Sequence, residues 1–559
     1  MSTTVQKSAF RLAVIAAAVL AVQSFAALPE IRITTVNNTE PGTSNNSGGG
    51  WVMPGMPAAT NKTYVKITEF KLTDQSNAAN NITRSQKPDS IKVRGNSTAS
   101  AEKKPYKIKF GERIALFGDS AAKSWVLLAN WYDGTFALNA MAFELGKRLG
   151  LEFTNKYWFV DVYINGTYKG IYQLTEQIQS HRGRVDLKEN KRGWLVELDF
   201  HDPDDEAERK TFFTTTQYNM KAFIKSPELD DTAFTKNPND ANQLNFVKND
   251  VNNLVNKMNE GGFPTNGYRD KIDFDSWAKY VLIQLVLDNH DFNSKAQSGY
   301  LLGSNYCYKI DSSSAQRIKA GPLWDFDLAA GIERSGGFGG GFGGAGSYPA
   351  HYKTYQDSIA PTHTFYRRLW DDPAFKARYY KTWIKYKSDF QAMSSVIDNV
   401  KSKVEGSIQG KGNNRWANNS MASPATLTTQ TFNNEVQQLK TWWNNRLNFV
   451  DQKLRSYNID TTKDIIQSAP PPDPPKKPTS VVSGFGKAGN SLSLVKNGLR
   501  INTADPTSLK VFTLTGDVVR KQALAAGNHA VSLGDLPRGM YLVRVNTAGV
   551  KQTVKVAVR

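Results

Sequence analysis

Apolar and polar residues alternate along much of the first part of the chain. Alternation of this kind predicts strands with one buried face. The dipeptide Asn165-Gly166 separates two alternating runs, a combination typical of a β-hairpin. The expected strands cover residues 30–36, 63–72, 90–94, 105–110, 158–164, 168–174 and 194–198, and a helix is expected over 134–149.

From about residue 242 onward, apolar residues recur mostly at helical spacing. The segment 276–287 is almost entirely apolar, so we expect a buried helix there with Ser276 as its N-cap. The other expected helices cover 246–258, 365–369, 375–390 and 432–454. A β-rich part is therefore followed by an α-rich part, which predicts an α+β fold.

The end of the chain has a different pattern. Residues 468–480 are rich in proline and should form an extended linker. Beyond the linker, residues 481–559 contain short alternating runs at 509–514, 518–524, 529–533, 540–545 and 550–558, which predict a small β-sandwich. The expected organisation is a signal peptide (1–26), a large domain (28–467), the linker (468–480) and the sandwich (481–559).

The N-terminal segment has the three parts of a secretory signal peptide. Lys7 and Arg11 supply the positive region, residues 12–22 the apolar stretch, and Ser24-Phe25-Ala26 the cleavage site. Since no later run approaches the roughly 20 apolar residues of a membrane-spanning helix, we expect an exported protein without a transmembrane segment.

Charge and cysteine content narrow the possible partners. The 559 residues include 70 Lys and Arg against 51 Asp and Glu, a net charge of +19, which favours anionic partners. The basic residues form no long run, so we expect no nucleic-acid partner. Cys307 is the single cysteine, which excludes an intramolecular disulfide, and no Cys/His spacing resembles a zinc site.

Acidic residues gather around one expected hairpin. The buried helix ends in Asp288-Asn289-His290-Asp291, where carboxylates oppose the helix dipole, so another group should stabilise them. A strand over 299–310 and a returning strand over 316–323 would bring Asp291 to the same end as Asp325 and Asp327. Carboxylates at such an edge suit Mg²⁺. Aspartates that cap tight turns are the alternative.

Five blocks of the chain, in order, resemble the CotH-type (spore coat protein H) kinases across about residues 28–455. They are Arg94-Gly-Asn-Ser-Thr98, Lys103-Lys-Pro-Tyr-Lys-Ile-Lys-Phe110, Trp125-Val-Leu-Leu-Ala-Asn130 with Asp133, Val162-Tyr-Ile-Asn-Gly-Thr-Tyr-Lys-Gly-Ile-Tyr-Gln-Leu-Thr-Glu-Gln177, and Asn289-x-Asp291 with Gly321-Pro-Leu-Trp-Asp-Phe-Asp-Leu-Ala-Ala-Gly331. The resemblance implies an atypical, two-lobed protein-kinase-like fold that transfers the γ-phosphoryl group of ATP to a protein hydroxyl.

The resemblance also implies roles for the acidic residues. Asp291, at the family's Asn-x-Asp position, is the expected catalytic base. Asp325 is the expected ligand of Mg²⁺ or Mn²⁺ with Asp327 behind it, although these two could exchange roles. Family members often carry Asn before the following strand, where this chain has Ser298, so Asn293 is the substitute metal ligand.

The expected nucleotide contacts come from the first half of the chain. Arg94 and Asn96 are expected to shape the phosphate loop. Lys107 is the preferred lysine for the α/β-phosphates, and Lys104 and Lys109 of the same strand are expected at the surface. Glu176 lies near the nucleotide in one interpretation and forms a structural ion pair in the other.

The last fifty residues, with Leu509-Lys-Val-Phe-Thr-Leu-Thr-Gly-Asp-Val-Val519 and Leu536-Pro-Arg-Gly-Met-Tyr-Leu-Val-Arg-Val545, resemble the sorting domains of the type IX secretion system. This implies contact with an export machinery and a secreted or cell-surface location; a structural or binding β-module is the alternative.

The predicted function is thus an exported atypical kinase acting on Ser or Thr of a protein acceptor. A non-catalytic surface or matrix protein that binds carbohydrate through its aromatic residues is the second hypothesis, and glycoside hydrolysis by paired carboxylates is a third.

Overall fold

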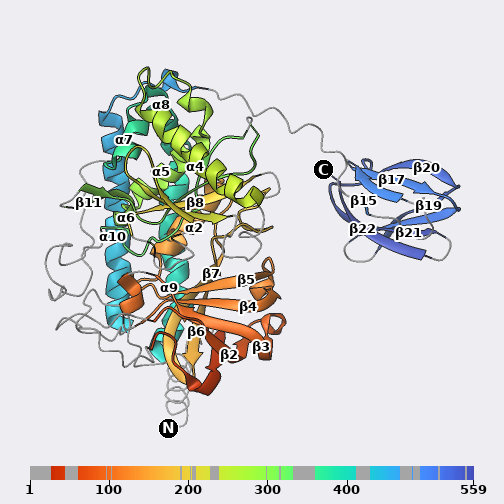
Figure 1. The fold of residues 1–559 in the computed structure, drawn as a ribbon. Helices are drawn as coiled ribbons and strands as arrows, with labels where there is room; N and C mark the ends of the chain where they lie inside the picture. The colour runs from red at the N-terminus through yellow and green to blue at the C-terminus, as the bar shows by residue number, and fades with distance from the viewer. Residues whose placement is uncertain are drawn as a thin grey trace, which may run out of the picture. The chain divides into compact units, whose positions relative to one another are not determined.

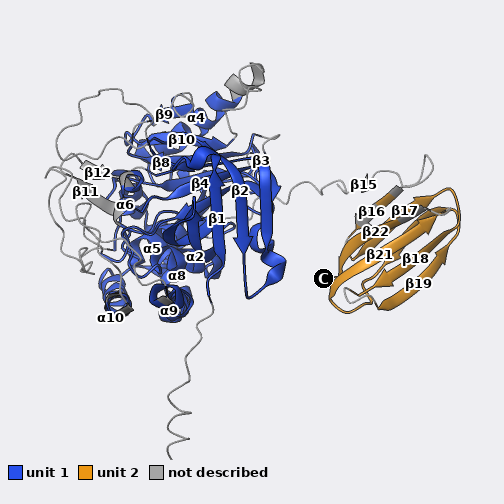
Figure 2. Cartoon of the chain, turned by 90° about the horizontal axis from the view of Figure 1, so that it is seen from below, with its two compact units in different colours: residues 1–467 blue, residues 468–559 orange. Residues whose placement is uncertain are grey.

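The chain divides into two compact units, residues 1–467 and 468–559 (Figure 2). The expected signal peptide and linker, as well as Asn96, lie outside the described residues. The computed structural model describes residues 27–43, 61–95, 97–101, 103–188, 192–201, 203, 209, 211–226, 238–296, 299–313, 316–331, 359–410, 429–465, 481–482, 491–495, 497–513, 517–547 and 550–558.

A closed barrel with strand order β1-β2-β3-β4-β5-β7-β6 opens the first unit (Figure 1). It is antiparallel except where β1 pairs with β6, and its interior is filled by alternating apolar residues such as Ile31, Ile91, Ile108 and Trp125. The strands are β1 (Glu30–Thr35), β2 (Val65–Thr73), β3 (Ile82–Val93), β4 (Tyr106–Ile114), β5 (Ala122–Leu128), β6 (Tyr157–Ile164) and β7 (Thr167–Glu176).

The rest of the first unit is mostly helical and surrounds a five-stranded sheet of order β14-β13-β8-β10-β9, beside a two-stranded sheet β11-β12. The strands are β8 (Trp194–Asp199), β9 (Phe212–Thr214), β10 (Lys221–Ser226), β11 (Ser294–Ala296), β12 (Gly299–Leu301), β13 (Asn305–Lys309) and β14 (Lys319–Ala320). The helices are α2 (Leu138–Arg148), α4 (Pro238–Asn259), α5 (Phe274–Val286), α6 (His290–Asn293), α7 (Thr364–Trp370), α8 (Pro373–Gln391), α9 (Met393–Gly410) and α10 (Thr429–Ser456).

Helix α5 runs through the core of this part, as its apolar sequence predicts. Eleven of its residues are buried, and it packs against α2, α8 and α10. The expected N-cap was wrong by a few residues. Asp273 is the cap, and its side chain accepts a hydrogen bond from Ser276 N at 2.8 Å.

The second unit is a β-sandwich, as predicted, with sheets β15-β16-β17-β20 and β19-β18-β21-β22. Its core holds residues from both sheets, among them Ile501 and Val543. The strands are β15 (Val481–Val482), β16 (Ser491–Val495), β17 (Gly498–Thr503), β18 (Thr507–Phe512), β19 (Val518–Leu524), β20 (Gly527–Ser532), β21 (Gly539–Thr547) and β22 (Val550–Val558).

The structure corrects the expected hairpin after the acidic loop. The predicted strand 299–310 is interrupted at residues 302–304, so that β12 pairs with β11 whereas β13 pairs with β8 and β14. Strands β5, β9, β10, β11, β15, β16 and β17 and helices α6 and α9 were not predicted. The signal for α9 was present, because Ile397, Val400, Val404 and Ile408 recur at helical spacing and are buried.

Candidate functional site

The acidic loop after α5 is held by a residue distant in sequence. Asp288 has a positive φ of 52°, and burial raises the pKa of its carboxyl, whereas Arg446 of α10 lowers it. The Arg446 side chain is fully buried, and its Nη2 donates to Leu285 O at 2.6 Å and lies 3.7 Å from Asp288 Oδ1. Arg446 is therefore the group that stabilises the carbonyl end of α5 and the acidic residue beside it.

Asp291 lies in α6, immediately beyond this loop, and is half-buried. Its carbonyl oxygen accepts a hydrogen bond from Gly303 N at 2.8 Å. A side chain at Gly303 would approach the Cβ of Asp291 and the ring of Phe200, each to 3.3 Å. The interruption of the predicted strand at residues 302–304 thus lets the chain pass close to Asp291.

Asp325 has a left-handed backbone conformation, with φ of 65°. Its Oδ2 accepts from Ser304 Oγ at 3.0 Å, and its carbonyl oxygen accepts from Asn289 Nδ2 at 3.3 Å. The next peptide is fixed too, because Phe326 N donates to Asn139 Oδ1 of α2 at 3.0 Å. Strained conformations persist where surrounding contacts over-determine them, so these three contacts indicate a position built to aim the Asp325 carboxylate.

Asp291 and Asp325 lie on either side of one short segment. Gly303 binds Asp291 through its N–H, and the adjacent Ser304 binds Asp325 through its hydroxyl. Asn289, two residues before Asp291, also reaches Asp325. The structure thus brings together the two acidic motifs that the sequence separates, near α5, α6 and β8 in Figure 1.

Two further carboxylates of this cluster were missed by sequence reasoning. Glu197 and Asp199 are buried on β8, and Asp199 Oδ2 accepts from Ser304 N at 2.8 Å. Tyr306 Oη donates to Glu197 Oε1 at 2.6 Å. The available signal was two acidic residues, two positions apart, at the end of a strand that is otherwise apolar.

The electrostatics of the cluster show how closely these groups interact. Burial raises the pKa of the Asp325 carboxyl; Arg94 and the Ser304 hydroxyl lower it, while the charges of Asp199 and Glu197 raise it further. Burial also acts to raise the pKa of Asp199, but His201 and backbone N–H groups outweigh burial and lower it. Asp325 is therefore ionised only at a cost, which a cation at this site would offset.

Arg94 and Lys107 lie on the side of the barrel that faces this cluster. The Arg94 guanidinium stands 5.2 Å from the ring centroid of Trp324, the residue before Asp325. Lys107 of β4 is directly opposite Val126 of β5, and residues in such a pair lie on the same face of the sheet. Val126 packs in a cluster that includes Trp324, so Lys107 lies on the face of the barrel that contributes to this cluster.

Of the two lysines expected at the surface, Lys109 is exposed, whereas Lys104 is partly buried and structural, as is the neighbouring Lys103. Lys103 is buried and donates to the carbonyl oxygens of Ala129 and Ile171 at 2.8 and 2.7 Å, and burial lowers its pKa well below the usual value. Lys104 Nζ donates to Ala99 and Ala101 carbonyls at 3.1 and 2.8 Å. Both lysines fix the segment that follows Arg94.

Glu176 lies at the end of β7 within a buried cluster of charged groups. Its Oε2 accepts from Lys156 N at 2.9 Å, and Arg184 Nε lies 3.8 Å from Oε1. Burial and the adjacent Asp119 together raise the pKa of Glu176 to about 8. Burial acts to raise the pKa of Asp119 also, but its hydrogen bonds to Lys156 and Glu176 lower it, so the two carboxyls share one proton near neutral pH.

This cluster makes stability depend on pH in a defined direction. Glu176 titrates near 4.5 when unfolded and near 8 when folded, so the folded state holds the extra proton between these values and stability falls as pH rises through them. Glu176→Gln should abolish this pH dependence. At pH 8 its free energy of unfolding should exceed that of wild type by at least about 1 kcal/mol, since one pKa unit corresponds to about 1.4 kcal/mol.

Urea unfolding at several pH values, followed by tryptophan fluorescence, tests this prediction. Glu260→Gln is the control, because Glu260 is exposed and pairs only at the surface with Lys257. Parallel pH profiles for wild type and Glu176→Gln would contradict the shared proton.

Asp327 and Asn293 are the remaining predicted metal ligands. Asp327 is half-buried in the turn that follows Asp325. Asn293 ends α6, but its side chain lies outside the described residues, as does Asn96 altogether. Within the described ranges, no three Asp, Glu, His or Cys side chains are placed to hold a metal ion by themselves.

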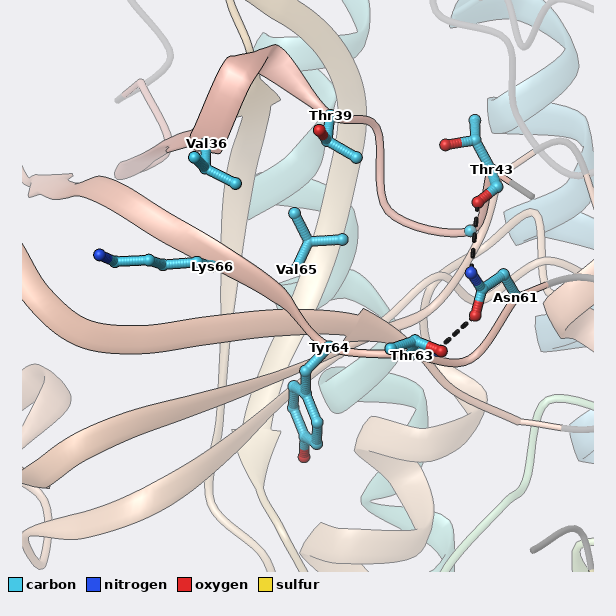
Figure 3. Close-up of a pocket in the computed structure, with 9 residues that line it drawn as sticks. Val36, Thr39, Thr43, Asn61, Thr63, Tyr64, Val65 and Lys66 are labelled. Carbon is cyan, nitrogen blue, oxygen red and sulfur yellow. Dashed lines mark hydrogen bonds between the residues drawn. The ribbon is translucent and has the colours of Figure 1, made fainter. Parts of the chain in front are cut away.

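A separate pocket lies at the β1–β2 end of the barrel (Figure 3). Asn61 spans part of its wall, donating to Thr43 O at 3.4 Å and accepting from Thr63 N at 2.8 Å. The pocket contains no carboxylate and shares no residue with the acidic cluster. Its lining residues are Val36, Thr39, Gly42, Thr43, Asn61, Thr63, Tyr64, Val65 and Lys66.

The fold and the cluster define a mixed α/β protein with converging carboxylates beside a barrel, followed by a β-sandwich. Residues 91–450 match the family described as CotH kinase protein, and the chain belongs to this family. Residues 495–559 match the secretion system C-terminal sorting domain, which indicates export to the cell surface or beyond through a secretion machinery. No curated protein in the comparison matches the chain. In the described part of the chain, no helix has the length and apolar character to cross a membrane.

Proposed function

We propose that this protein is an exported phosphotransferase with a two-lobed, kinase-like domain, which moves the γ-phosphoryl group of ATP to a Ser or Thr hydroxyl of a protein. The observation that carries the proposal is the fixed, left-handed Asp325 beside the Asn289-x-Asp291 loop. Phosphoryl transfer depends mainly on positioning and on neutralising charge, and both are features of this cluster. In this proposal the barrel is one lobe and the helical part is the other.

Asp291 acts as the base in this proposal. The acceptor oxygen forms a bond to the γ-phosphorus while the bond from that phosphorus to the β,γ-bridging oxygen breaks, and ADP leaves with the electron pair. The proton of the acceptor hydroxyl passes to the Asp291 carboxylate. The contact between Gly303 N and Asp291 O holds α6 in place for this role.

The donor set suits Mg²⁺ or Mn²⁺. Magnesium is commonly held by one or two carboxylates together with phosphate oxygens and water, so a site without three converging protein ligands is compatible with it. Asp325 would hold the ion, with Asp327 or Asn293 as a second ligand, and the bound ion would supply charge neutralisation at the phosphates. Arg94 and Lys107 would contact phosphate oxygens, and Asn96 would lie in the loop next to Arg94. Glu176 belongs to the barrel, and no contact with the nucleotide is proposed for it.

The carbohydrate-binding alternative depends on accessible aromatic rings. Within the described residues, every tryptophan is buried except Trp158, which is partly buried and stacks on Phe117 at 5.2 Å. A platform of exposed tryptophans is therefore absent from this part of the chain, which favours the phosphotransferase.

The test is nucleotide binding and transfer of labelled phosphate from ATP by the purified protein, with Mg²⁺ or Mn²⁺, to itself or to a generic acceptor. Asp291→Asn should bind nucleotide as wild type does but transfer at least about a hundredfold more slowly, the usual contribution of a general base. Asp398→Asn is the control, since Asp398 is exposed on α9. Wild type that binds no nucleotide with either metal, or Asp291→Asn that transfers normally, would contradict the proposal.

A further inference from the structure

One sheet of the second unit is strongly basic. Its four strands, β19, β18, β21 and β22, lie side by side in Figure 2 and contain no Asp or Glu. Inward-facing residues such as Leu509 and Val543 fill the core, so the alternate residues form the outer face. The described basic residues of the outer face are Lys510, Lys521, Arg544 and Lys555. Arg520 of β19 is not one of them, because it is opposite the inward-facing Val511 and pairs with Asp535.

The strand register aligns cations across the outer face. Lys521 of β19 is opposite Lys510 of β18, which is opposite Arg544 of β21, and all three are exposed. Directly opposed like charges destabilise a sheet. Among the described residues, no ion pair joins Lys510, Lys521 or Lys555 to an acidic side chain. Folding of the unit therefore does not explain this arrangement.

An apolar row lies next to the basic one. Phe512 of β18 is opposite Val518 of β19 on one side and Leu542 of β21 on the other. Val518, Val519 and Met540 are 44%, 41% and 41% exposed, and they are three of the five large apolar residues that are well exposed in the described chain. These side chains gather at one end of the sheet, so the outer face is amphipathic.

We propose that the outer face of the sheet β19-β18-β21-β22 binds an anionic lipid surface. The cation row matches the phosphate groups of such a surface, and the adjacent apolar row can enter the boundary between headgroups and acyl chains. A hydrophilic polyanion would match the cations but would leave Val518, Val519 and Met540 in water. This inference does not depend on the phosphotransferase proposal.

Vesicle co-sedimentation of the purified full chain tests the inference. Wild type should bind phosphatidylcholine vesicles that contain about 30% phosphatidylglycerol at about 0.1 M salt, and should not bind pure phosphatidylcholine. The double variant Lys510→Gln with Lys521→Gln should bind on the order of tenfold more weakly. Val518→Ser should also weaken binding, because it removes apolar contact without removing charge.

The whole chain is basic, so a charge-matched control is needed. The double variant Arg500→Gln with Lys463→Gln removes two exposed positive charges from elsewhere, on β17 and beyond α10, and should bind as wild type does. Equal weakening by this control would show that net charge alone drives binding and would overturn the inference. Failure of wild type to bind the anionic vesicles would also overturn the inference. If Val518→Ser has no effect and soluble polyphosphate competes fully, the ligand is a hydrophilic polyanion and the inference is overturned too.

Discussion

Asp325→Asn is expected to lower the rate of phosphoryl transfer by about a thousandfold or more and to weaken binding of the metal–nucleotide complex. The substitution keeps the shape of the side chain and an oxygen that can accept from Ser304. It removes the negative charge that is proposed to hold the metal ion. The ion would supply several kcal/mol of charge stabilisation in the transition state, and about 1.4 kcal/mol corresponds to a tenfold change in rate.

Stability should change in the opposite direction. Burial and the charges of Asp199 and Glu197 make an ionised Asp325 carboxyl destabilising to the fold. The variant with a neutral asparagine should therefore unfold at the same urea concentration as wild type or at a higher one. A loss of activity with retained stability separates a functional role from a folding defect.

Asp327→Asn completes this experiment because the two aspartates could exchange roles. If Asp325 is the main metal ligand, Asp327→Asn should lower the rate of phosphoryl transfer less than Asp325→Asn does. The reverse order would move the role to Asp327, and normal transfer by both variants would contradict a metal site at this turn.

Arg446→Leu is expected to lower the free energy of unfolding of the first unit by about 3–5 kcal/mol. Arg446 is fully buried, and its guanidinium binds the Leu285 and Val286 carbonyls at 2.6 and 3.3 Å beside Asp288. Leucine would leave these carbonyls and a buried carboxyl without their cationic partner. Since the same turn leads to Asp291, the variant should also transfer phosphate more slowly under conditions where it remains folded.

Tryptophan fluorescence during urea unfolding is a suitable measurement, because all twelve tryptophans precede residue 468 and report on the first unit alone. Arg455→Leu on the same helix is the matched control. Its side chain is 67% exposed and pairs with Asp451, so its loss should cost less than about 1 kcal/mol. Adding Asp288→Asn to Arg446→Leu should restore part of the stability. Equal effects of Arg446→Leu and Arg455→Leu would contradict a buried structural role.

Local signals in the sequence were sufficient for much of the architecture. The turn at Asn165-Gly166 is confirmed, with φ of 49° and 78° at its two residues, because few other dipeptides accept this geometry easily. The expected strands 518–524 and 550–558 have the bounds of β19 and β22. Helix α5 was recognisable from its apolar run. Each of these features depends on residues close together in the chain.

The hairpin that was expected to join the two acidic motifs shows the limit of such reasoning. The motifs do come together, but not through one continuous pair of strands. The chain leaves the strand pattern at residues 302–304, and Gly303 and Ser304 bind the two motifs separately. Apolar alternation cannot show this interruption, since the residues on both sides of it remain apolar and aromatic.

The sequence by itself determined the order of the domains, most of the strands and helices, the family resemblance and the two acidic motifs. The tertiary structure alone decided which groups surround the charged residues. It places Glu197 and Asp199 beside Asp325, Arg446 beside Asp288, Lys103 against the Ala129 and Ile171 carbonyls, and Asp119 against Glu176. These partners lie tens to hundreds of residues apart in the chain. Their contacts follow from how distant elements pack, and burial then sets the strength of their interactions, so no local pattern of residues encodes them.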